Sequence, residues 1–393
     1  MTVGGFAARG YEGVRDAFAA AQAADEGGGQ LCVYRHGEKV VDLWAGRDKV
    51  NDRLYGEDTI TVIMSCTKGA TAAVVHRLGE RGLVDYEAPL ADYWPEFAAA
   101  GKADARVWHL MSHSVGLPGV DPESGVTARD LLYADRHVAA LAAMAPVWTP
   151  GASCQYHPIT YGSLLGEVTR RASGKSVSQL FAEEIAGPLK LDFWIGLPEA
   201  QEHRVAPHFS PTPGLSADQL AGLIQGMGVD VTTRLAKVVL GSFTHTAELI
   251  QDMNNREGRA AEVPAGNGVT DAASLARMYA AMIGEVDGVR ILKPETVEKA
   301  RTLRTAAMVP PGDFGRLQLG PPTAYGLGYE FAKATLPMLG PGSFGHAGAG
   351  GRIGFAHPES GIAAAYVANT MLTLPPNTPD PRWSWMEELR KAV

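Results

Sequence analysis

The chain has 393 residues, of which 46% are hydrophobic and 20% are charged. This composition is typical of a globular protein and excludes a disordered, collagen-like or coiled-coil chain. Acidic residues outnumber basic ones and give a formal net charge of −8, which argues against nucleic acid or an anionic membrane as a partner. The three cysteines are too few for a disulfide framework.

The length allows two or three domains. The first residues show no basic segment followed by an apolar core, so we expect no signal peptide. No run of about 18 uncharged apolar residues occurs, so we expect no membrane-spanning helix. These features predict a soluble, cytoplasmic protein with a large hydrophobic core, and they leave the oligomeric state open.

Hydrophobic periodicity changes along the chain. A one-sided apolar pattern predicts a helix at 5–24, and two apolar runs at 30–35 and 39–46 around a glycine-containing turn predict a β-hairpin. The apolar run at 61–79 is typical of a helix. Further helices are expected at 127–134, 139–145, 159–172, 177–185, 272–283 and 294–304. Late strands are expected at 325–331, 343–346, 353–357 and 362–369.

Strands at both ends with helices between them predict an α+β fold. One domain, formed by 1–82 and 267–393, would hold an antiparallel sheet flanked by helices, and 83–266 would form a mostly helical domain inserted into it. No alternating β-α-β rhythm spans the chain, which disfavours a doubly wound parallel sheet. The glycine-rich stretch 345–354 has the spacing of neither a P-loop nor a dinucleotide fingerprint, so we expect no nucleotide site.

The strongest chemical signal is the run Ser65-Cys66-Thr67-Lys68 within an apolar segment. Residues three apart share a helix face, so the hydroxyl of Ser65 and the amine of Lys68 can meet. An apolar setting favours the neutral amine, and a neutral amine can take the proton that keeps serine a weak nucleophile. The plain alternative is a surface lysine whose stem lies along the helix beside a serine.

The other residue patterns that could indicate a functional site are weaker. His109 and His113 have a spacing seen in zinc sites, but no HExxH glutamate or third ligand accompanies them, so structural histidines are the better interpretation. The absence of GxSxG removes the nucleophile elbow of the α/β-hydrolases. Without further context Tyr156 would be an ordinary loop aromatic that competes with Tyr161, which is expected to pack inside a helix.

With these motifs the sequence resembles the serine hydrolases built like class C β-lactamases and penicillin-binding proteins, and within them the family VIII carboxylesterases. The resemblance runs through SCTKGATA at 65–72, HLMSHSVGLPG at 109–119, TPGASCQYHPITYGSLLGEVTRRASGKS at 149–176 and FGHAGAGGRIGFAHPESGIAAAYVANTM at 344–371. It implies a class C β-lactamase-like fold with the active site in the cleft between the two domains.

The resemblance also implies roles for individual residues. Ser65 would be the nucleophile, Lys68 its base or proton relay, and Tyr156 the group that hydrogen-bonds the nucleophile and passes a proton to the leaving group. The backbone N–H groups of Ser65 and Ala349 would form the oxyanion hole, in which each donor contributes about 3 kcal/mol. The resemblance places three further residues in the substrate-binding set: His157, His346 and Gly348.

Two departures from the family pattern bear on the substrate. The usual Tyr-x-Asn motif is Tyr156-His157-Pro158 here, and proline offers neither a side-chain amide nor an N–H. The usual Lys-Thr-Gly motif is His346-Ala347-Gly348, so the fixed cation that attracts a β-lactam carboxylate is absent. A histidine there is largely neutral near pH 7 unless an acid neighbours it. Both changes favour a neutral ester substrate.

The sequence therefore predicts a serine carboxylesterase that acts on a small-molecule ester, without a metal or organic cofactor. An acyltransferase or amidase that uses the same acyl-enzyme is the main alternative, followed by a β-lactamase or peptidase and by a non-catalytic binding protein. Segments 207–228 and 241–268 are rich in apolar residues and are expected to form either a lid over the site or ordinary packed helices.

Overall fold

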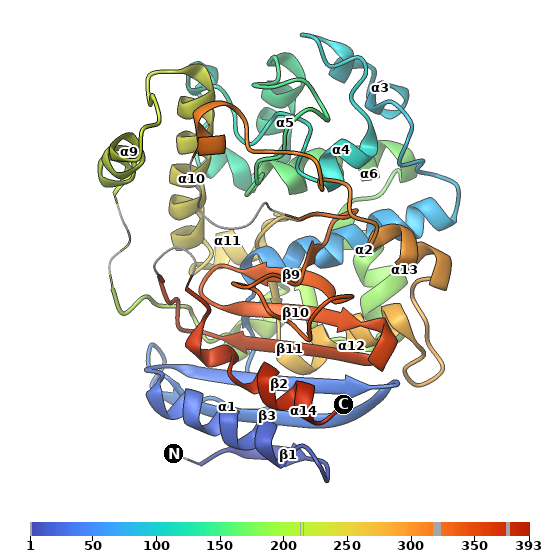
Figure 1. Cartoon of the computed structure of the whole chain (residues 1–393), viewed down its shortest axis with the longest axis vertical. Helices are drawn as coiled ribbons and strands as arrows, with labels where there is room; N and C mark the ends of the chain where they lie inside the picture. The colour runs from blue at the N-terminus through green and yellow to red at the C-terminus, as the bar shows by residue number, and fades with distance from the viewer. Residues whose placement is uncertain (1, 213, 215, 317–323, 375–377) are drawn as a thin grey trace.

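An antiparallel sheet joins the two ends of the chain (Figure 1). The computed structural model describes residues 2–212, 214, 216–316, 324–374 and 378–393. Among these residues eight strands form the sheet in the order β1-β3-β2-β11-β10-β9-β8, with β4 paired to β3, and every neighbouring pair is antiparallel. The strands are β1 (Gly4–Ala7), β2 (Gly28–Arg35), β3 (Glu38–Asp48), β4 (Arg53–Leu54), β8 (Glu330–Phe331), β9 (Phe344–Gly348), β10 (Arg352–His357) and β11 (Ile362–Ala368).

Helices cover both faces of this sheet. Helices α1 (Glu12–Ala24) and α14 (Trp385–Lys391) pack together on one face, and α12 (Ala272–Ile283) covers the other. Alternate residues of β11 point to opposite faces, so Tyr366 joins the core under α1 while Ala365 joins the core under α12. Burial on both faces explains why this strand is an unbroken apolar run.

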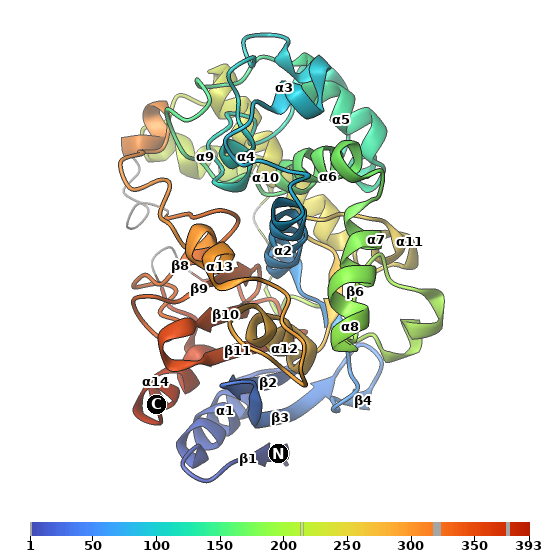
Figure 2. The same ribbon diagram turned by 90° about the vertical axis from the view of Figure 1, so that its right-hand side faces the viewer.

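Helix α2 (Thr67–Glu80) runs between the sheet and the helical part of the molecule (Figure 2). It is buried on almost all sides from Thr67 to Val75, as expected for a helix that is apolar around its whole circumference. Small residues permit this close packing: a Cβ added at Gly69 would lie 2.3 Å from the hydroxyl of Tyr279. The residues at the start of α2 are thereby held rigidly between two layers.

A helical region lies on the side of α2 that faces away from the large sheet (Figure 2). Its α-helices are α3 (Leu90–Tyr93), α4 (Val107–Met111), α5 (Ala134–Ala143), α6 (Thr160–Ser173), α7 (Val177–Phe181), α8 (Gly187–Leu189), α9 (Ala217–Gly226), α10 (Arg234–Asp252) and α11 (Arg256–Ala260). A small antiparallel sheet of β5 (Thr61–Val62), β7 (Gly268–Thr270) and β6 (Phe193–Ile195) ties this region to the start of α2. Helix α13 (Pro294–Ala300) follows α12.

The antiparallel sheet with helices on both faces confirms the predicted α+β class, and the hairpin at β2 and β3 is also confirmed. The helix expected at 5–24 is wrong at its start, because residues Gly4–Ala7 pair with β3 as an edge strand. The strand expected at 325–331 is limited to β8. The helix expected at 127–134 is limited to a 3-10 turn, Arg129–Leu132. The division into two domains stays a prediction.

Of the two segments expected to form a lid or packed helices, 207–228 contains α9, and 241–268 contains the end of α10 and all of α11. Residues 213 and 215 lie outside the described residues. Among the helices of the described residues, none is long and apolar enough to cross a bilayer.

Candidate active site

Ser65 lies where strand β5 turns into helix α2. The residues Met64–Cys66 form a single 3-10 turn, and Met64 has a positive φ of 51°, which reverses the chain sharply. The hydroxyl of Thr67 donates to Met64 O at 2.6 Å and accepts from Gly268 N at 2.9 Å, which pins the turn to β7. The helix expected at 61–79 therefore begins only at Thr67, and Ser65 precedes it.

Three predicted side chains meet at the hydroxyl of Ser65. The Nζ of Lys68 lies 2.9 Å from Ser65 Oγ, and the hydroxyl of Tyr156 donates to the same oxygen at 2.8 Å. Lys68 Nζ also donates to the backbone carbonyl of Ala265 at 2.8 Å and lies 4.9 Å from the centre of the Tyr156 ring. A single hydroxyl oxygen is thus within hydrogen-bond reach of an amine and a phenol.

Burial sets the protonation of this group. Lys68 is fully buried, and the loss of solvation lowers the pKa of its amine to about 7, against the opposing influence of the Glu330 carboxylate and of Cys66. Burial raises the pKa of Tyr156 well above its usual value, and its hydrogen bond to Ser65 only partly opposes this. Near neutral pH the lysine is therefore the group that can be deprotonated, whereas the tyrosine keeps its proton.

The competing tyrosine does not reach the serine. Tyr161 lies in α6 with its ring 5.9 Å from Lys68 Nζ, and its buried hydroxyl has no hydrogen-bond partner among the described residues. The preference for Tyr156 over Tyr161 at this position therefore agrees with the geometry.

The two histidines of the 109–119 motif make different contacts, and one of them packs against Tyr156. The ring of His113 packs against Tyr156 at 4.8 Å and against Tyr325 at 4.4 Å between centroids, and its Nδ1 accepts from His157 N at 3.1 Å. His109 Nδ1 accepts from Arg106 N at 3.0 Å. No group of three or more potential ligands that could hold a metal occurs among the described histidine, cysteine, aspartate and glutamate residues.

Both ring nitrogens of His157 are engaged in hydrogen bonds within the protein. Its Nε2 accepts from Leu117 N at 3.1 Å, and its Nδ1 lies 2.6 Å from Gln155 O and donates to it. The side chain is buried. These bonds tie the ring to the loop that carries Tyr156, and a contact between His157 and a substrate stays a prediction.

His346 lies on β9 beside Tyr156, with 6.2 Å between the ring centres. Its Nδ1 donates to Ala347 O at 2.7 Å, while its Nε2 is buried and has no partner among the described residues. Burial lowers the pKa of His346 to about 4, although the Glu330 carboxylate, 3.7 Å from Nδ1, opposes this shift. The ring is therefore neutral near pH 7 even though an acid lies beside it, because burial outweighs the carboxylate. Direct contact between this buried ring and a substrate stays a prediction.

Gly348 and Ala349 bring the end of β9 against the Ser65 turn. A Cβ at Gly348 would lie 2.3 Å from Ile63 O, so only glycine allows this approach. The next residue, Ala349, is exposed, and within the described residues its N–H donates to no backbone carbonyl. Ser65 is in the first turn of a helical segment, where N–H groups lack a partner within the helix. Among the described residues, neither of the two expected oxyanion donors has a backbone hydrogen-bond partner, and both lie close to the same turn.

Two contributors were not predicted. The carbonyl of Ala265 holds Lys68, and it is positioned because Thr71, one turn along α2, donates to Pro264 O at 2.6 Å. Glu330 on β8 is buried and accepts from Ala347 N at 3.1 Å, which places a carboxylate behind His346. A backbone carbonyl leaves no mark in a sequence, but an isolated acid in the apolar run 327–331 is a signal that could have been used.

Comparison with known proteins gives matches along nearly the whole chain. Residues 14–385 match the family model described as Beta-lactamase. The chain is 38% identical over 361 residues to the esterase/beta-lactamase LipL of Mycobacterium tuberculosis, covering 88% of this chain and 78% of that protein. It superposes over its full length on a family VIII carboxylesterase (TM-score 0.83, 34% identity, 100% of both chains) and on a penicillin-binding protein homologue from Caulobacter crescentus (TM-score 0.83, 30% identity, 100% of both chains).

Proposed function

The chain belongs to the Beta-lactamase family, as its motifs predicted, and on this premise we propose that it is a serine carboxylesterase that hydrolyses neutral esters through an acyl-enzyme on Ser65. One observation carries the proposal. The oxygen of Ser65 lies within 2.9 Å of both an amine whose pKa is about 7 and a phenol that stays protonated. That arrangement supplies a base and an acid to one nucleophile at neutral pH.

In the first half-reaction, neutral Lys68 takes the proton of Ser65 as Oγ attacks the ester carbonyl. The N–H groups of Ser65 and Ala349 hold the oxyanion of the tetrahedral intermediate. Collapse of the intermediate breaks the bond to the alcohol, which leaves with the proton of Tyr156, and the Lys68 ammonium then reprotonates Tyr156. The products of this half-reaction are one alcohol and one acyl-enzyme.

In the second half-reaction a water molecule attacks the acyl-enzyme. The Tyr156–Lys68 pair removes one proton from the water, the same N–H groups hold the oxyanion, and Ser65 Oγ leaves and recovers its proton from the pair. A carboxylic acid is released and the starting protonation is restored.

The choice of an ester over a β-lactam rests on charge. His346, at the position of the β-lactamase lysine, has a pKa of about 4 and is neutral at pH 7, so it supplies no cation for a β-lactam carboxylate. Pro158 has no amide to bind an acylamino side chain. The similarity to a family VIII carboxylesterase supports the same choice.

The test is hydrolysis of p-nitrophenyl butyrate by the wild type and by Ser65→Ala in parallel, with thermal unfolding to show that both are folded. We expect the variant to lose at least about a thousandfold in kcat/KM, because only binding and oxyanion contributions remain. Turnover by Ser65→Ala at the wild-type rate would refute the proposal.

An acyltransferase would form the same acyl-enzyme and pass it to an alcohol or amine in place of water. The proportions of acid and transfer product in the presence of added alcohol distinguish the two. A carboxylesterase gives mainly acid at moderate alcohol concentration, whereas transfer that dominates over hydrolysis would favour the alternative.

A further inference from the structure

The turn between β9 and β10 carries Ala349 and is held by side chains from the C-terminal segment. We propose that Arg382 and Trp383 are positioning residues for the oxyanion site, and that they act by fixing the orientation of the Ala349 N–H. This inference rests on the proposed function, because the N–H has a catalytic task only if Ser65 forms a tetrahedral intermediate.

Three consecutive carbonyls of the turn are each bound by a different side chain. Arg352 Nη1 donates to Ala349 O at 2.9 Å, Arg382 Nη2 donates to Gly350 O at 2.5 Å, and Trp383 Nε1 donates to Gly351 O at 2.9 Å. The peptide on the other side of Ala349 is held as well, because Gly351 N donates to the carbonyl of Gly348 at 3.2 Å. The Ala349 N–H shares a peptide plane with Gly348 O, and Arg352 holds the plane on the other side of Ala349. Arg382 acts through the next peptide: its bond to Gly350 O fixes the plane whose N–H, that of Gly351, binds Gly348 O.

The turn needs such anchors because of its sequence. Gly350 and Gly351 have positive φ values of 79° and 88°, a region that glycine enters freely and other residues rarely adopt. A glycine pair gives the sharp turn but little stiffness of its own. The side chains also occupy the space that larger turn residues would need: a Cβ at Gly351 would lie 2.0 Å from Arg382 Nη2.

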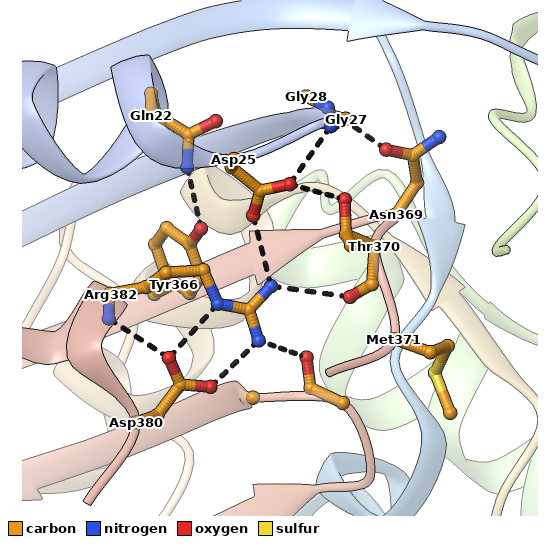
Figure 3. A network of polar contacts seen from close by, with 12 residues as sticks. Gln22, Asp25, Gly27, Gly28, Tyr366, Asn369, Thr370, Met371, Asp380 and Arg382 are labelled. Atoms are coloured by element: carbon orange, nitrogen blue, oxygen red, sulfur yellow. Dashed lines mark hydrogen bonds and ion pairs between the residues drawn. The ribbon is translucent and has the colours of Figure 1, made fainter. Parts of the chain in front are cut away.

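Arg382 is itself held rigidly (Figure 3). Its guanidinium forms a two-pronged pair with Asp380, through Nε to Oδ1 at 3.0 Å and Nη2 to Oδ2 at 2.7 Å. Its Nη1 donates to Asp25 Oδ2 and to Thr370 O, both at 3.2 Å. All these groups are almost fully buried, and Asp25 also accepts from the Thr370 hydroxyl at 2.5 Å.

This network joins the end of α1 to two segments that lie far from it in sequence, the residues after β11 and the segment before α14 (Figure 3). A buried ion pair contributes little net stability over an apolar replacement, since desolvation offsets most of the attraction. What the guanidinium adds is geometric: it directs one remaining N–H to Gly350 O. A role in geometry predicts a kinetic effect larger than the change in stability.

The chain offers a matched pair of variants. Trp383→Phe removes the indole N–H that binds Gly351 O and keeps an aromatic ring in place. Trp385→Phe makes the same substitution two residues later in the same segment, where the buried indole N–H has no partner among the described residues and the ring stacks on Phe355. Arg382→Lys is a third, more severe variant, which keeps the positive charge but loses the planar guanidinium that binds several acceptors at once.

For each variant we would measure kcat and KM for p-nitrophenyl butyrate, the inhibition constant of phenylboronic acid, and the unfolding temperature. A boronic acid forms a tetrahedral adduct with the serine, so its affinity reports the oxyanion site directly. We expect Trp383→Phe to lower kcat/KM about tenfold through kcat and to weaken the boronic acid by a similar factor, less than the loss of a whole donor. Trp385→Phe should change both by less than about twofold, and Arg382→Lys should show the larger loss.

Equal kinetics and equal boronic acid affinity in the two tryptophan variants would overturn the inference, as would a loss of kcat/KM with unchanged boronic acid affinity. The tryptophan pair decides the question even if Arg382→Lys does not fold. A wild-type protein without Ser65-dependent ester turnover would instead overturn the proposed function, so the two failures are distinguishable.

Discussion

The pH dependence of ester hydrolysis tests the role of Lys68 most sharply. The proposed reaction requires the neutral amine, and burial lowers the pKa of Lys68 to about 7. Below that pH the amine is protonated and cannot accept the proton of Ser65, so kcat/KM should fall as the pH falls. Tyr156, whose pKa burial raises far above this range, should not contribute a limb near neutrality.

The magnitude follows from the titration. Each pH unit below the pKa lowers the neutral fraction about tenfold, so about a tenth of the sites are competent at pH 6 and about a hundredth at pH 5. The charged and titratable groups that influence Lys68 are few. The Glu330 carboxylate raises its pKa, and the neighbouring histidines 113, 157 and 346 are held neutral by burial.

Glu330→Gln is the informative perturbation, because glutamine can still accept from Ala347 N but carries no charge. Removing the carboxylate should lower the pKa of Lys68 further and move the acidic limb of the profile to lower pH. The assay is kcat/KM for p-nitrophenyl butyrate from pH 5 to 9, with a stability check at each end. A limb that stays in place or moves to higher pH in Glu330→Gln, or a wild-type rate independent of pH, would refute the reasoning.

Three substitution pairs extend the account, all measured with p-nitrophenyl butyrate. Lys68→Met should lower kcat/KM about a thousandfold. The control is Lys102→Met, at a buried lysine that donates to three backbone carbonyls; the fraction of this variant that folds should keep the wild-type kcat/KM. Equal losses in the two variants would remove Lys68 from the mechanism. Tyr156→Phe should lower kcat/KM about a hundredfold or more. Tyr161→Phe removes a hydroxyl that has no partner in the described part of the chain, so it should change kcat/KM little. Comparable rates in the two variants would show that the Tyr156 hydroxyl is dispensable. Gly348→Ala should lower kcat/KM about 10- to 100-fold, because the strand must move by about 0.7 Å to bring the new Cβ from 2.3 to 3.0 Å of Ile63 O. Gly166→Ala in α6 meets only a 3.8 Å contact and should leave kcat/KM unchanged. An unchanged kcat/KM in Gly348→Ala would mean that the closeness of β9 to the Ser65 turn does not matter.

The elements that could be predicted from the sequence are those with a regular apolar pattern. The helix at 272–283 matches α12 at both ends, because its apolar pattern is regular and Asp271 accepts from Ser274 N as an N-cap. The strand at Gly4–Ala7 was missed because four residues with two glycines carry no alternating pattern. Its glycines are needed for close approach, since a Cβ at Gly5 would lie 1.9 Å from Asp42 O.

The residues of the candidate site also fall into those that the sequence could predict and those that it could not. The Ser65–Lys68 pair follows from a spacing of three residues, and the resemblance contributed Tyr156, which is 91 residues away from Ser65 and has no local signal of its own. The carbonyl of Ala265 and the Arg382 network could not be predicted, because they depend on a backbone group and on contacts between distant parts of the chain.

The central claim is that Ser65 carries the acyl group. Its most direct test is to mix the protein with p-nitrophenyl butyrate at a pH below 6, quench with acid during turnover, and locate the label by intact mass and peptide mapping. The account predicts one butyryl group, on the peptide that contains Ser65, and no such group in Ser65→Ala. Labelling of another residue during productive turnover, or an undiminished label in Ser65→Ala, would contradict it.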